Sequence, residues 1–208
     1  MKTNRTQLHS ILTGVFVACL LITNVMSAKT FTLGSVVLPT AVVIFPVVYI
    51  VNDVLAEIYG FRKATRIIML GFAMNLLAVI AYSIAIALPA PDFAAEGAAA
   101  FAMTLGSTWR VLIASFAAYL VGSLVNAGVM VRMKERLRQH LMLRCVLSTL
   151  LGEGVDAIIF ITIAFAGTMP WESLLVMIAA QAAFKTVFEV VFYPLTRVVI
   201  KKMEQLPA

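Results

Sequence analysis

The sequence predicts an all-α integral membrane protein with six transmembrane helices. Hydrophobic residues make up 62% of the 208 residues, charged residues make up only 12%, and the mean hydropathy is +1.00. A soluble domain has about 25% charged residues. Because a spanning helix needs roughly 20 mostly apolar residues, we predict six spans, at 9–28, 39–59, 64–88, 107–131, 144–168 and 171–200. Together they form a single six-helix transmembrane domain over residues 1–208.

Basic residues are distributed unevenly among the segments that flank these spans. If the N-terminus is cytoplasmic, the outer segments hold only Lys29 and Arg110, and the other flanking Lys and Arg residues lie on the inner side. Positive charge accumulates on cytoplasmic loops of membrane proteins, so we predict that both termini are cytoplasmic. The net charge of +6 is then explained by topology, and we expect no nucleic-acid partner.

Two connecting segments are too long for simple turns. Apolar and polar residues alternate in part of 29–40, and a proline lies near the end of this segment. These features predict an extended segment over the outer mouth that could act as a lid. Residues 88–108 are rich in alanine and glycine. We expect this second segment to be a mobile or amphipathic surface stretch without chemistry of its own.

Ionisable residues lie inside the spans as well as around them. Three spans each carry one pair at helical spacing: Asp53 with Glu57, Glu153 with Asp156, and Lys185 with Glu189. Spacings of three or four residues place both members of a pair on one helix face. Counted from the nearest interfacial arginine, the pairs lie about 7–18 Å deep, in one slab toward the cytoplasmic face. Since each such group costs about 2.5–3.5 kcal/mol to insert, we favour a functional cavity over packing alone.

Uncharged residues near the same depth complete the candidate substrate-binding set. They are Asn52, Asn75, Gln181, Phe45 and Tyr49. The amides could equally serve as interhelical hydrogen-bonding groups, and the aromatic rings could cover a flat ligand or simply pack. No metal-binding motif and no Gly-rich phosphate loop is present in the sequence. We therefore expect no metal, no cofactor, no catalytic residue and no ATP hydrolysis by this chain.

The charge balance of this set indicates what the cavity binds. Five carboxylates face the single ammonium group of Lys185, which would leave four negative charges if all were ionised. Three explanations are open: some carboxyls are protonated, Lys185 and water screen them, or the ligand supplies hydrogen-bond donors or positive charge. A site rich in acceptors predicts a ligand rich in donors.

Three motifs follow one another along the chain: DxxxExYGxxxA at 53–64, GExxDxxxF at 152–160 and KxxxExxxxP at 185–194. They resemble the signature blocks of the queuosine precursor transporter family, also called the vitamin uptake transporter family. The resemblance implies a fold similar to the substrate-binding subunits of energy-coupling-factor transporters, without the ATPase module. It also implies import of a 7-deazaguanine such as preQ0, preQ1 or queuine through the cytoplasmic (inner) membrane of a bacterium.

The resemblance further implies roles for individual residues. Glu153 or Asp156 would accept the two parallel donors of a guanine edge. Further substrate contacts would come from Asn52, Asp53 and Glu57. Lys185 and Glu189 would form an ordering ion pair.

Other interpretations remain open at this level. The chain could be a vitamin-binding or nucleobase-binding subunit that docks on a separate energising complex. An intramembrane aspartyl protease would need two aspartates that share a proton; Asp53 and Asp156 could form such a pair, but the spacing of the neighbouring glycines differs from the protease signature. Proton coupling, facilitated diffusion and assembly as a homodimer are also compatible with the sequence.

Overall fold

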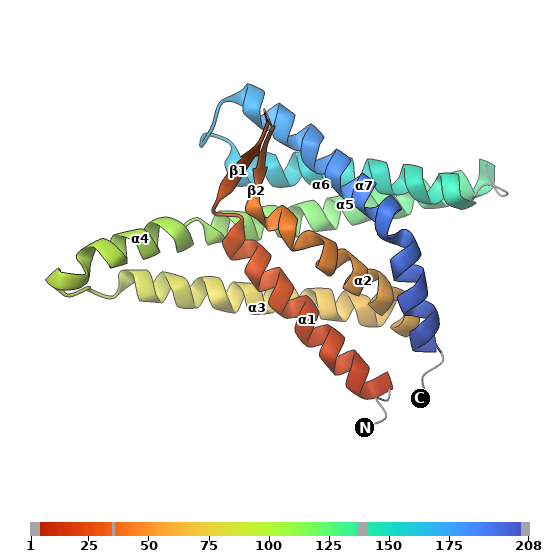
Figure 1. Cartoon of the computed structure of the whole chain (residues 1–208), viewed down its shortest axis with the longest axis horizontal. Coiled ribbons are helices and arrows are strands. Elements are labelled where there is room, and N and C mark those ends of the chain that lie inside the picture. The colour runs from red at the N-terminus through yellow and green to blue at the C-terminus, as the bar shows by residue number, and fades with distance from the viewer. Residues whose placement is uncertain (1–4, 35, 137–140, 205–208) are drawn as a thin grey trace. The chain divides into compact units, whose positions relative to one another are not determined.

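The computed structural model describes residues 5–34, 36–136 and 141–204, and the side chains of most of them (Figure 1). In chain order the elements are α1 (Arg5–Met26), β1 (Thr30–Leu33), β2 (Val36–Pro39), the 3-10 helix η1 (Thr40–Val43), α2 (Phe45–Tyr59), α3 (Phe61–Ala87), the 3-10 helix η2 (Asp92–Ala94), α4 (Ala95–Leu105), α5 (Thr108–Arg136), α6 (Leu141–Phe165) and α7 (Trp171–Glu204). Over these residues the protein is mostly helical, which confirms the predicted all-α membrane class.

Each predicted span corresponds to one helix, but the second span was predicted too long. α2 begins at Phe45 and not at residue 39, because β2 and η1 occupy the preceding positions. Pro46 falls in the first turn of α2, where its missing N–H would have no helical partner anyway. With 15 residues, α2 is shorter than the roughly 20 residues that cross a bilayer.

Four helical segments within the described residues are long and apolar enough to cross a membrane. They are Thr6–Met26, Arg62–Ala87, Asp92–Val125 and Trp171–Phe192. α2 and α6 are not among them, so the count of six spans stays a prediction for these two helices.

The two long connections contain secondary structure of their own. Residues 30–33 and 36–39 form an antiparallel strand pair in which Leu33 of β1 pairs with Val36 of β2. Gly34 has a φ of 62° at the turn, a conformation that glycine adopts without steric cost. The predicted extended segment is therefore confirmed, while its role as a lid stays a prediction. The second connection contains η2 and α4, and α4 buries no residue.

The chain divides into two compact units, of which the first comprises Met1–Lys29, Thr40–Thr108 and Val191–Ala208. Within it, α1, α2 and α3 pack against one another (Figure 1). Its buried side chains include Phe16, Val51, Leu55, Ile68 and Val79. α1 approaches α3 at Gly71, where an added Cβ would lie 2.8 Å from the Leu20 side chain.

The second unit comprises Thr30–Pro39 and Trp109–Val190. Its core joins α5, α6 and the first half of α7 through Val111, Ala114, Ala118, Phe160, Ile161, Ala164, Phe165, Leu174 and Met177. Val37 of β2 packs against this core, which holds the strand pair to the second unit. These three helices form the scaffold of the polar residues described next.

Candidate functional site

An ion triad of Glu153, Asp156 and Lys185 connects α6 and α7 within the second unit. The Nζ atom of Lys185 lies 2.9 Å from Oε2 of Glu153 and also donates to Oδ2 of Asp156. The lysine side chain is 5% exposed, and the two carboxylates are 24% and 20% exposed. The spacing of three residues on α6 turns both carboxylates toward one ammonium group on the neighbouring helix.

The triad combines a fixed cation with spare acceptor capacity. With all three groups ionised, one positive and two negative charges leave a net charge of −1. A carboxylate has about four lone-pair positions, and Lys185 contacts Asp156 through one of its two oxygens, Oδ2. Asp156 can therefore accept further hydrogen bonds from a donor-rich ligand while Lys185 stays paired.

Gln181 lies one turn before Lys185 on α7 and is 1% exposed. Neither its amide nitrogen nor its amide oxygen has a hydrogen-bond partner among the described residues. An unsatisfied buried polar group costs about 1–3 kcal/mol. A ligand that offers both a donor and an acceptor would remove that cost, so Gln181 is suited to form hydrogen bonds with the polar edge of a ligand.

Gly122 allows α5 to lie close to the triad. A Cβ added to Gly122 would lie 3.0 Å from Cβ of Asp156 and 3.0 Å from the carbonyl oxygen of Gly152. Without a side chain at Gly122, α5 packs directly against the turn of α6 that carries Glu153 and Asp156. Gly122 was not predicted from the sequence, although small residues at membrane helix contacts are the pattern that could have indicated it.

Arg110 binds the end of the helix that carries both carboxylates. Its guanidinium group donates from Nε to the carbonyl oxygen of Ile163 and from Nη2 to that of Ala166. The last carbonyls of a helix lack intrahelical partners and carry partial negative charge, so a cation at this position stabilises α6. Arg110 was interpreted from the sequence only as a topology signal, because its contact spans 53 residues of chain.

The other predicted binding residues belong to the first unit or lie outside the described side chains. Asn75 is 2% exposed, and its Nδ2 atom donates to the carbonyl oxygen of Gly71 at 3.2 Å. The Oδ1 atoms of Asn75 and Asn52 are buried without a described partner, and Phe45 is half-buried. The side chains outside the described set are those of Tyr49, Asp53, Glu57 and Glu189. Their roles, including the Lys185–Glu189 pair, stay predictions.

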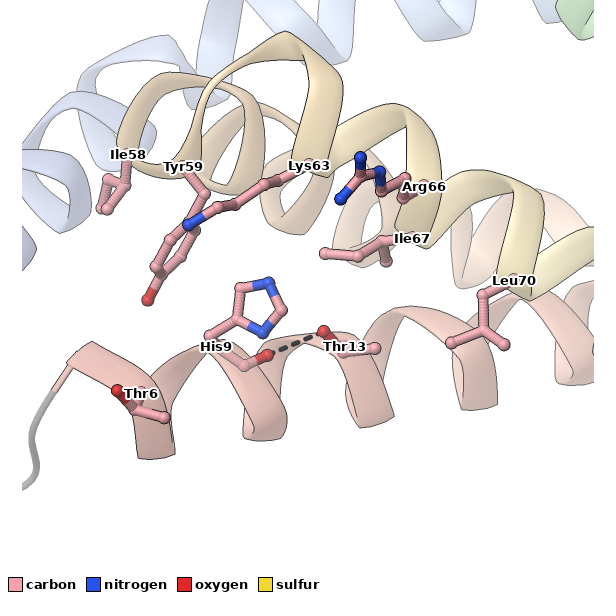
Figure 2. Close-up of a pocket in the computed structure, with 9 residues that line it drawn as sticks. All are labelled: Thr6, His9, Thr13, Ile58, Tyr59, Lys63, Arg66, Ile67 and Leu70. Carbon is pink, nitrogen blue, oxygen red and sulfur yellow. Dashed lines mark hydrogen bonds between the residues drawn. The ribbon is translucent and has the colours of Figure 1, made fainter.

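A cavity of about 670 Å³ lies in the first unit, between α1, the end of α2 and the start of α3 (Figure 2). We call it the α1–α3 cavity. It is lined by Thr6, His9, Thr13, Ile58, Tyr59, Lys63, Arg66, Ile67 and Leu70. None of the predicted substrate-binding residues is among them, so the cavity and the ion triad are built from different residues.

Comparison with protein families matches residues 39–199 to the family described as "Putative vitamin uptake transporter". The chain belongs to this vitamin uptake transporter family. The family includes queuosine precursor transporters, which confirms the resemblance seen in the three motifs. No curated protein and no solved structure matches the chain significantly, so the likeness to energy-coupling-factor subunits stays a prediction.

Membership in the vitamin uptake transporter family defines the general role of the protein. It is a multi-pass membrane protein that transports a vitamin-like small molecule, and this role indicates a transporter rather than an enzyme. The matched range contains all members of the ion triad, together with Gln181, Gly122 and Arg110. The substrate must therefore be argued from the chemistry of these residues.

Proposed function

We propose that the protein imports a 7-deazaguanine queuosine precursor, such as preQ0, preQ1 or queuine, across the bacterial cytoplasmic membrane. The observation that supports this proposal most is the ion triad, with two carboxylates held on one buried lysine. Buried Gln181, whose amide lacks a described partner, lies one turn away on the same helix.

A guanine edge carries hydrogen-bonding groups that are complementary to those of these residues. Its ring N–H and exocyclic amino group are two parallel donors, which a carboxylate accepts in bidentate fashion. Either Glu153 or Asp156 could take this role while the other keeps Lys185 neutralised. The Gln181 amide can then address the carbonyl and ring nitrogens of the base. An aminomethyl substituent would bring a cation that competes with Lys185 for the carboxylates.

The same contacts weigh against the aspartyl protease interpretation. In such an enzyme Asp156 would have to share a proton with a second aspartate, whereas here it accepts a hydrogen bond from the ammonium group of Lys185. A binding subunit that needs a separate energising complex would instead be recognised by its copurification with an ATPase.

Uptake in a queuosine-auxotrophic bacterium tests the proposal. PreQ0, preQ1, queuine and queuosine would each be supplied to cells that express the protein, and the queuosine content of transfer RNA would be measured. We expect rescue by at least one precursor. Failure of all four compounds in cells with verified expression would show that the substrate class is wrong.

Amide variants locate the binding role within the same assay. Asp156→Asn and Glu153→Gln should each reduce rescue at least tenfold while membrane insertion is retained. At the residue that binds the base, an amide cannot accept two parallel donors; at the other residue, an amide no longer neutralises Lys185. Glu96→Gln, in the exposed first turn of α4, is the matched control and should transport normally. Loss of folded protein in parallel with transport would favour a purely structural role for the triad.

A further inference from the structure

The α1–α3 cavity changes from cationic to apolar along its length. Lys63, Arg66 and Leu70 follow at spacings of three and four residues, so they line one face of α3. The two cations lie in the first two turns of α3, and Ile67 and Leu70 follow deeper along the helix. From Lys63 to Leu70 the helix axis advances about 10 Å. A ligand that fills the cavity should therefore have one anionic and one apolar end.

The cationic end is partly held in place by an aromatic ring. Figure 2 shows the Lys63 ammonium group next to Tyr59, with the His9 ring facing both from α1. Lys63 Nζ lies 5.9 Å from the centroid of the Tyr59 ring, a cation–π distance. The His9 ring contacts the same tyrosine edge-on, with 4.8 Å between the two ring centroids.

The cations of this cavity are available to an external anion. Lys63 and Arg66 are exposed, and among the described side chains the ion pairs within 4.0 Å involve Lys185 alone. Thr6 and His9 add polar groups from α1 on the opposite wall. This positive charge lies at the end of the membrane helices that we predict to be cytoplasmic, where the leaflet carries anionic lipids.

We propose that the α1–α3 cavity binds an anionic phospholipid, with its phosphate between Lys63 and Arg66 and the start of an acyl chain against Ile67 and Leu70. A free phosphate shares the headgroup chemistry, but it would leave the apolar end of a cavity of about 670 Å³ unfilled. A phospholipid matches both ends and is present at this depth of the membrane.

Binding of fluorescent phosphatidylglycerol to the purified full-length protein in neutral detergent tests this proposal. Each basic residue near a membrane surface strengthens the electrostatic attraction to anionic lipids. Removing two of them in Lys63→Gln/Arg66→Gln should therefore weaken phosphatidylglycerol binding roughly 30-fold. The matched control is Arg62→Gln/Arg132→Gln, which removes the same charge from exposed positions that do not line the cavity. The control should stay within roughly threefold of wild type. Equal losses in both variants would overturn the proposal in favour of diffuse surface attraction.

Two further measurements separate a lipid from its headgroup alone. Phosphatidylcholine with the same acyl chains should bind at least tenfold more weakly, and inorganic phosphate should not displace phosphatidylglycerol at millimolar concentration. Leu70→Asn should weaken phosphatidylglycerol binding severalfold, because Leu70 lines the apolar end. Displacement by phosphate together with an unaffected Leu70→Asn variant would show a simple anion site and overturn the lipid assignment. Melting of the Lys63→Gln/Arg66→Gln variant within roughly 2 °C of wild type would verify its fold.

Discussion

The ion triad and the α1–α3 cavity use positive charge in opposite ways. Lys185 is 5% exposed and bound by two carboxylates, whereas Lys63 and Arg66 are exposed. Removing an ammonium ion from water costs several kcal/mol, so a buried lysine persists only with partners that are always present. An exposed cation stays hydrated and can exchange water for a ligand. The comparison shows that burial decides whether a charge has a permanent partner within the fold.

The largest effect is expected at Lys185. Lys185→Met removes the partner of two largely buried carboxylates, and breaking such a pair costs about 3–5 kcal/mol of folding free energy. Thermal melting in detergent would measure this loss. The triple variant Lys185→Met/Glu153→Gln/Asp156→Asn should recover most of the stability, because no uncompensated charge remains buried.

Lys185→Met/Glu189→Gln tests the partner that was predicted from the sequence. If the triad is the principal interaction, this double variant should stay nearly as unstable as the single lysine variant. If the three substitutions of the triple variant lowered the free energy of unfolding by strictly additive amounts, their side chains would not interact, and the triad would be contradicted.

Packing of α5 against the triad gives the second largest expected effect. Gly122→Ala should destabilise the protein by about 1–3 kcal/mol, because the added methyl group meets Asp156 and the Gly152 backbone at 3.0 Å. Transport should fall further, since the displaced helix carries both carboxylates. Gly128→Ala is the control on the same helix, because nothing lies within 4 Å of its added Cβ. A stable and active Gly122→Ala variant would show that α6 tolerates the shift.

Gln181 is buried like Lys185, but its amide has no hydrogen-bond partner among the described residues. Gln181→Leu should raise stability by on the order of 1 kcal/mol, since it removes an unsatisfied buried amide while keeping similar volume. If Gln181 contacts the substrate, uptake should fall at the same time. Paired melting and uptake measurements would show these opposite signs. Lower stability with unchanged uptake would assign the amide to an interhelical contact.

Several parts of the fold were predictable because their signals are local. Long apolar runs indicate helices wherever they occur, and alternation with a closing proline indicated an extended segment at 29–40, which the structure shows as the paired strands β1 and β2. The start of α2 was predicted at residue 39 because apolar β2, η1 and α2 form one continuous hydrophobic run. Hydropathy does not distinguish a short buried strand from a helix, so only the structure could place this boundary at Phe45.

The candidate site was predictable as a set of residues but not as a set of contacts. Glu153, Asp156, Gln181 and Lys185 stood out because polar groups in an apolar helix are costly. The spacing of four residues suggested Glu189 as the partner of Lys185, since spacing identifies neighbours on one helix. The observed contacts of Lys185 cross from α7 to Asp156 and Glu153 of α6, which precede it by 29 and 32 residues.

Composition and motif spacing alone therefore determined the class of this protein, its family and the residues worth testing. These properties depend on the cost of polar groups in lipid and on periodicity along one helix, both of which are readable along the chain. Tertiary structure alone decided that Lys185 joins Glu153 and Asp156, that Gly122 admits α5 beside them, and that Lys63 and Arg66 line a cavity. Such contacts depend on how separate helices pack, and packing brings together residues that no local pattern connects.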